Sequence, residues 1–118
     1  MTDVANGSVM SELWNAIKYA MESKKGKYAL DTYLEILGEY ADQLIAKTEK
    51  EEQLLYQGGH CEATQLEEFY QFTVKLYFKE EDGTDVLKEA SRKIEKKRFT
   101  SDTMRLLEHP KTFEISKG

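Results

Sequence analysis

Hydrophobic positions recur every three to four residues through the first half of the chain, the spacing that gathers them on one helix face. The first such stretch predicts a helix over about residues 9–24, capped by Ser8. Lys24, Lys25 and Gly26 have the character of a helix end, cations followed by glycine. The apolar face of this helix consists of Val9, Leu13, Trp14, Ile17, Ala20 and Met21.

The second stretch predicts a longer helix over about residues 28–56. Its polar section, residues 48–53, is either exposed or locally broken, and Gly58-Gly59 ends the helix in both cases. The turn before this helix is short, so the first two helices are expected to run antiparallel. The predicted apolar face consists of Leu30, Tyr33, Leu34, Leu37, Tyr40, Ala41, Leu44 and Ile45.

Residues 63–79 fit two periods. With period two the segment is a strand with alternating apolar residues, and with period 3.6 it is a helix with a polar stripe. Residues Thr64 to Glu67 match a capping box, which is a helix start signal. A single strand would also lack a pairing partner elsewhere in the chain. We therefore predict a helix here.

After a turn at Asp82-Gly83, Thr84 or Asp85 caps a fourth helix that extends to about Arg98. Thr100 or Ser101 caps a short fifth helix, which stops before Pro110. The fold class predicted is all-α, a bundle of four main helices plus a short C-terminal helix. One domain is expected over residues 1–118, with flexible ends at 1–7 and 112–118.

Composition supports this interpretation. One proline and seven glycines in 118 residues are few, whereas all-β folds need frequent turn residues. No apolar run spans a bilayer, and residues 1–14 do not have the pattern of a secretory signal. The lone cysteine, Cys61, fits a reducing compartment, and the cytoplasm is the expected location.

Charge is distributed unevenly along the chain. Residues 1–34 are neutral, residues 35–82 carry a net charge of −8, and residues 83–118 carry +3, for a total of −5. Such segments either are solvated surfaces or meet a partner of opposite sign.

Catalytic and metal-binding chemistry find little support. Cys61 could pair with His109 as a nucleophile and base, but the residues around Cys61 contain no supporting motif. Three Cys and His residues in all, Cys61, His60 and His109, are too few for a tetrahedral zinc site. Phosphate-binding loops are absent from the sequence. Neither a metal nor a cofactor is expected.

Three groups of residues are candidate binding surfaces. Phe69, Phe72, Val74 and Phe78 are an aromatic and aliphatic surplus, which belongs either to a central helix or to a protein interface. A set of carboxylates could meet a basic partner: Glu49, Glu51, Glu52, Glu67 and Glu68. A basic cluster on the predicted helix 88–98 could contact nucleic acid or an acidic partner: Arg92, Lys93, Lys96, Lys97 and Arg98.

The sequence thus predicts a non-catalytic protein-binding module, such as a small regulator, inhibitor, immunity-type protein or assembly factor. Its partner would be another protein, either a second copy or a different chain, and not a membrane. The alternative is an accessory subunit of a nucleic-acid-handling complex that uses helix 88–98. A third hypothesis is a small enzyme centred on Cys61.

Overall fold

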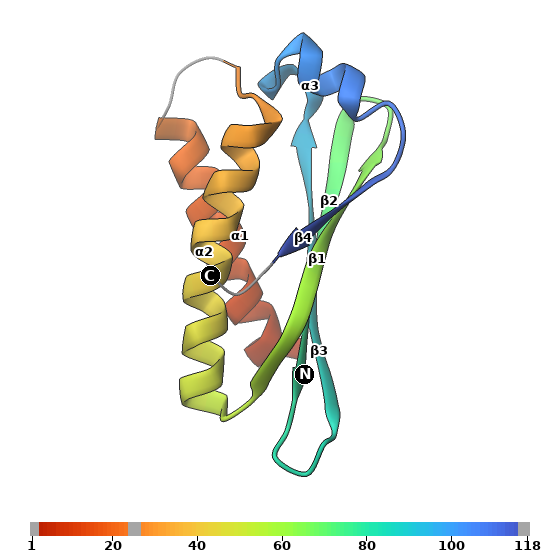
Figure 1. Cartoon of the computed structure of the whole chain (residues 1–118). Coiled ribbons are helices and arrows are strands. Elements are labelled where there is room, and N and C mark those ends of the chain that lie inside the picture. Colours follow the sequence, from red (N-terminus) through yellow and green to blue (C-terminus); the bar gives the residue numbers. More distant parts are fainter. Residues whose placement is uncertain (1–2, 24–26, 116–118) are drawn as a thin grey trace.

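The computed structural model describes residues 3–23 and 27–115, with side chains described for 11–23 and 27–115. Two long helices precede three long strands, and a short helix leads to a fourth strand (Figure 1). The elements are α1 (Asp3–Ser23), α2 (Leu30–Glu52), β1 (Leu55–Gln65), β2 (Phe69–Lys79), β3 (Asp85–Glu95), the 3-10 turn η1 (Lys96–Arg98), α3 (Ser101–Leu106) and β4 (Lys111–Ile115).

The strands form one antiparallel sheet in the order β3-β2-β1-β4. Helices α1 and α2 run antiparallel, as predicted, and cover one face of the sheet, whereas α3 lies at one end of it (Figure 1). Among residues 3–23 and 27–115, no helix lies over the opposite face of the sheet. The fold is therefore a layer of helices packed on a layer of antiparallel sheet. The prediction of an all-α bundle is wrong.

Residues 63–79, predicted to be a helix, lie in β1, a tight turn and β2. The apolar residues with period two all point to the helices and are buried: Tyr70, Phe72, Val74, Leu76 and Phe78. The presumed capping box instead begins at the end of β1 and runs into the turn, where the Leu66 amide donates to the Phe69 carbonyl at 2.8 Å. The strand has partners on both sides: β3, which is predicted as a helix, and β1, most of which is predicted as the connection between two helices.

The predicted fourth helix is β3 followed by η1. Its partly buried residues, Val86, Ala90 and Ile94, are four apart. A spacing of four fits a helix face and also one face of a strand, so the period does not separate the two. Leu87, which a helix would bury, is 45% exposed on the opposite face of the sheet.

Helix α2 ends at Glu52, with Gln53 in the left-handed conformation at φ 55°. Gly58 and Gly59 therefore do not end a helix but lie in β1. Gly58, with φ 126°, lies where the β1–β2 register shifts. A Cβ at Gly59 would come within 2.5 Å of the Lys75 carbonyl oxygen, so this position excludes a side chain.

Several local predictions hold, but the prediction that Ser8 caps the first helix is wrong, because α1 begins at Asp3. Thr100 caps α3, since its hydroxyl accepts from the Thr103 amide at 3.3 Å, and Asp82-Gly83 is the turn between β2 and β3. The expected helix end at residues 24–26 lies outside the described residues. Of the expected flexible ends, residues 3–7 belong to α1 and 112–115 to β4, whereas 1–2 and 116–118 are outside the described residues.

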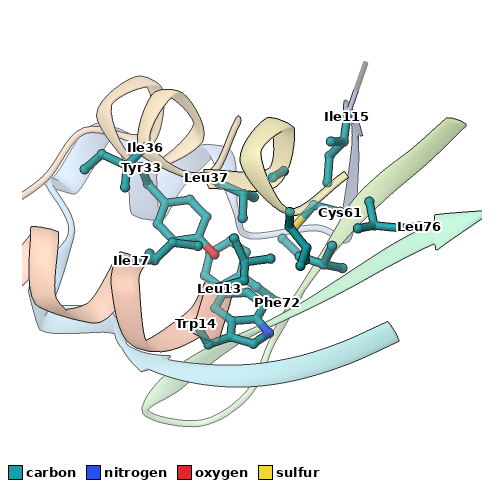
Figure 2. Packing of buried hydrophobic residues seen from close by; sticks show 14 of the residues in the cluster. Leu13, Trp14, Ile17, Tyr33, Ile36, Leu37, Cys61, Phe72, Leu76 and Ile115 are labelled. Atoms are coloured by element: carbon teal, nitrogen blue, oxygen red, sulfur yellow. The ribbon is translucent and has the colours of Figure 1, made fainter. Parts of the chain in front are cut away.

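The core lies between the helices and the sheet (Figure 2). Tyr33 of α2 packs on Phe72 of β2, with 4.6 Å between ring centroids, and both rings contact Phe99. These aromatic residues are fully buried within one chain. No helix in the described part of the chain combines the length and apolar character needed to cross a membrane.

Candidate functional site

The main candidate site is a groove between α1 and the edge strand β3, with a cavity of about 170 Å³. We call it the α1–β3 groove. Helix α1 and β3 lie next to each other although they are far apart in sequence. The groove is lined by Trp14, Ile17, Lys18, Met21, Glu22, Arg92, Lys93, Ile94, Glu95 and Arg98.

The floor of the groove is apolar. Trp14, Ile17 and Met21 are spaced as neighbours on one side of α1, and each is at most 3% exposed. Figure 2 shows Trp14 and Ile17 pointing from α1 toward the sheet. Ile94 of β3 packs against the same core. The floor is therefore held rigidly by residues that the fold needs for its own packing.

The rim of the groove is basic. Lys18, Arg92, Lys93 and Arg98 outnumber Glu22 and Glu95, which gives the lining a net charge of +2 in a chain whose total is −5. Within the described residues none of these four cations forms an ion pair, although Arg98 lies over the Tyr28 ring at 5.7 Å. The rim thus offers positive charge that the described chain does not neutralise by direct pairing.

The structure divides the basic residues predicted from the sequence. Arg92, Lys93 and Arg98 line the groove. Lys96 donates to Gln65 Oε1 at 2.9 Å and lies over the Tyr70 ring, and Lys97 pairs with Glu95 at 3.4 Å. These residues lie on a strand and a 3-10 turn, so the expected basic helix 88–98 does not exist.

The predicted acidic residues do not form one surface. Glu49 and Glu52 lie near the end of α2, where Glu52 pairs with the buried Lys88 at 2.9 Å and Glu49 accepts from the Tyr56 amide. Glu51 is exposed beside them. Glu67 and Glu68 are exposed in the turn between β1 and β2. Part of this charge therefore stabilises the fold locally.

The predicted aromatic set is mostly core. Phe72, Val74 and Phe78 are 0–1% exposed and do not line the α1–β3 groove, so we assign them to the core. Phe69 differs, because it is 36% exposed on the open face of the sheet.

The open face of the sheet also carries apolar side chains. Tyr77 and Leu87 are directly opposite each other on β2 and β3 and are 39% and 45% exposed. His60 of β1 lies near the Tyr77 ring, with 5.8 Å between centroids, and pairs with Glu62 at 2.7 Å. This surface is mixed in character and, unlike the groove, has no concentration of one charge.

Cys61 lies on the inner side of β1 and is fully buried. Burial, with a smaller contribution from Glu62, raises the pKa of its thiol to about 12, so it is protonated near neutral pH. His60 Nε2 lies 2.7 Å from Glu62 Oε2, and His109 is exposed beyond α3. In the part of the chain that the structure describes, no three His, Cys, Asp or Glu residues come together as metal ligands.

Comparisons with known proteins add no assignment. No protein family matches the chain, and neither curated proteins nor solved structures gave a significant match.

The sequence identified three cations of the rim, Arg92, Lys93 and Arg98, but missed Lys18 and the floor. Trp14, Ile17 and Met21 were assigned to the apolar face of a core helix, which is also where they lie. That they border a groove depends on β3 lying next to α1. Nothing in the local pattern of either segment indicates this contact.

Proposed function

We propose that this chain is a non-catalytic protein-binding module whose α1–β3 groove holds an acidic segment of a partner protein. The observation that supports the proposal is an apolar floor bordered by four cations without ion pairs in the described chain. Interfaces combine an apolar centre with a polar rim, and complementary charge selects the partner.

The state of Cys61 favours binding over catalysis. A thiolate is the reactive form of cysteine, and a pKa of about 12 leaves almost none of it near neutral pH. A buried free thiol is also compatible with a reducing compartment, and we propose the cytoplasm as the location.

The alternative is contact with nucleic acid through the same cations. A phosphate backbone is best met by a continuous row of free basic side chains. Here Lys96 and Lys97 are engaged with Gln65 and Glu95, and two carboxylates border the groove. These features favour a protein segment, which offers an apolar group as well as negative charge.

Trp14 supplies a direct test, because it is the single tryptophan of the chain and lies in the groove. Its fluorescence would be followed while the full chain is titrated with peptides that alternate Glu and Val, with the same peptides carrying Lys for Glu, and with a single-stranded oligonucleotide. We expect the acidic peptide to change Trp14 emission, and the basic peptide to have no effect.

Charge-reversed variants give the matched control. Arg92→Glu changes the groove, whereas Lys111→Glu makes the same charge change on β4 at the other edge of the sheet. We expect the first to weaken peptide binding about tenfold and the second less than twofold. A response to the oligonucleotide alone would favour the alternative, and equal effects of the two variants would contradict the proposal.

A further inference from the structure

We infer that the partner's acidic segment binds as an added strand, extending the sheet at the free edge of β3 beneath α1. This inference rests on the proposed function and specifies how the ligand is held: by its main chain, paired with β3, and by side chains that enter the α1–β3 groove. The class of ligand is an extended acidic peptide with at least one apolar side chain.

The first step is the edge itself. Strand β3 has eleven residues and pairs, within the described chain, with β2 alone. In an antiparallel sheet, alternate residues of an edge strand point their amide and carbonyl groups outward, and an extended chain can pair with them. An edge of this length can hold several residues of a ligand.

The second step is what forms the wall of the groove. Four consecutive residues of β3 line it, from Arg92 to Glu95. Successive side chains of a strand point to opposite faces of a sheet, so one face can present only two of these four. A groove lined by all four lies along the edge of the strand, where main-chain pairing takes place.

The third step is the apolar surface of α1 beside this edge. Trp14, Ile17 and Met21 of α1 form the apolar floor, and Lys18 lies at the rim. The inward side chains of an added strand would meet these residues. A cavity of about 170 Å³ is comparable with cavities that hold a benzene-sized group, on the order of 150 Å³. It suits one aliphatic or aromatic side chain.

The fourth step is charge. Arg92 and Lys93 are adjacent on β3 and thus lie on opposite faces of the sheet. An added strand would meet Lys93 on the open face of the sheet, which favours carboxylates on its outward face, whereas its inward side chains would lie near Arg92 and the apolar floor. Ile94, next to these cations on β3, favours an apolar residue at the neighbouring position of the ligand.

A second copy of this chain fits the edge less well than an acidic peptide. Lys88 and Arg92 are on the inward side of β3, and in a symmetric pair of two copies each would meet a like charge. Two β3 strands paired symmetrically about Ala90 would place Lys88 opposite Arg92 and Asp85 opposite Glu95, both like charges.

N-methylated peptides test the mode of binding. Three versions of a peptide of about eight residues alternating Glu and Val would be titrated against the full chain, with Trp14 emission as the readout. One is unmodified, one is N-methylated at odd positions and one at even positions. All three carry the same charges and side chains, but each modified version lacks a different half of the amide donors.

We expect one methylated version to bind at least about tenfold more weakly than the other, because only alternate amides pair with an edge. Equal binding of all three would overturn strand addition and leave groove binding intact. No binding of any version would overturn both proposals. A chain that sediments as a dimer through β3, or that binds an oligonucleotide and no peptide, would likewise overturn the inference.

Discussion

At the scale of single residues, burial decides what Cys61 can do. Cys61 lies between His60 and Glu62 in the sequence. The alternation of β1 turns the thiol into the core, while His60 and Glu62 pair on the open face. Cys61 thus packs in the core, whereas His60 and Glu62 contact each other at the surface.

The raised pKa of Cys61 predicts how stability depends on pH. The folded thiol keeps its proton up to about pH 12, whereas the unfolded thiol loses it near 9.0. Above pH 9 the folded state therefore binds more protons, and the free energy of unfolding should fall by about 1.4 kcal/mol per pH unit from this group. The contribution is fully present below pH 9 and is lost by pH 12.

Urea unfolding of wild type and Cys61→Ala at pH 7, 9 and 10 measures this effect. Between pH 9 and 10 wild type should lose more stability than the variant. Burial also raises the pKa values of Tyr33 and Tyr56, but both proteins contain these tyrosines, so they do not cause a difference between the two. Parallel loss in the two proteins would count against the assignment. A thiol reagent should label wild type only after denaturant is added.

At the scale of elements, a glycine in a strand and a glycine in a helix differ in the space available for a side chain. Gly59 of β1 leaves no room for a side chain, because a Cβ would approach the Lys75 carbonyl oxygen to 2.5 Å. At Gly38 of α2, a Cβ would have no atom within 4 Å apart from those of its chain neighbours and its own helix backbone. One glycine is required by close approach of two strands, and the other is not required by space.

Substituting each glycine by alanine should therefore give opposite results. Gly59→Ala is expected to lower the free energy of unfolding by about 2 kcal/mol, because the strands must move apart. Gly38→Ala should raise it by about 0.5–1 kcal/mol through helix propensity. Thermal or urea unfolding compares the two, and a neutral Gly59→Ala would show that β1 and β2 are not held at this distance.

The elements also show why the fold class was mispredicted. Three strands of eleven residues each need only two tight turns, so few glycines and prolines do not exclude a sheet. The apolar alternation in residues 70–78 was visible in the sequence. A helix is nevertheless predicted there, because Thr64 begins a capping box and residues 55–65 and 85–95 do not show a strand pattern that could pair with it.

At the scale of the whole molecule, α3 completes the start of α2. Ala29 precedes α2 and has no side chain that could cap it. The Leu30 amide donates instead to Thr103 Oγ1 at 2.8 Å, and Thr103 is 2% exposed in α3. Two further hydrogen bonds hold the chain before α2 at the same place. The Tyr28 amide donates to the Arg98 carbonyl, and the Thr100 amide donates to the Tyr28 carbonyl.

Thr103→Val removes this cap while keeping the branched shape. We expect it to lower the free energy of unfolding by about 1–2 kcal/mol, because the Leu30 amide would be buried without an acceptor. Thr103→Ser keeps the hydroxyl and should lose less. If valine and serine destabilise equally in urea unfolding, loss of packing rather than loss of the cap explains the effect.

Features that depend on residues close together in the chain could be predicted from the amino-acid sequence. These are the two N-terminal helices, the Thr100 cap, the turn at Asp82-Gly83, and the basic character of residues 92–98. Each follows from contacts within a few residues, where spacing and side-chain type set the outcome.

The sheet and the groove depend on contacts between residues far apart in the chain. A strand has no stability without its neighbours, so β1, β2 and β3 exist because they pair with one another across the chain. The groove likewise requires Trp14 and Arg92, 78 positions apart, to border the same cavity. Such contacts depend on the packing of whole elements, which no local pattern in the sequence records.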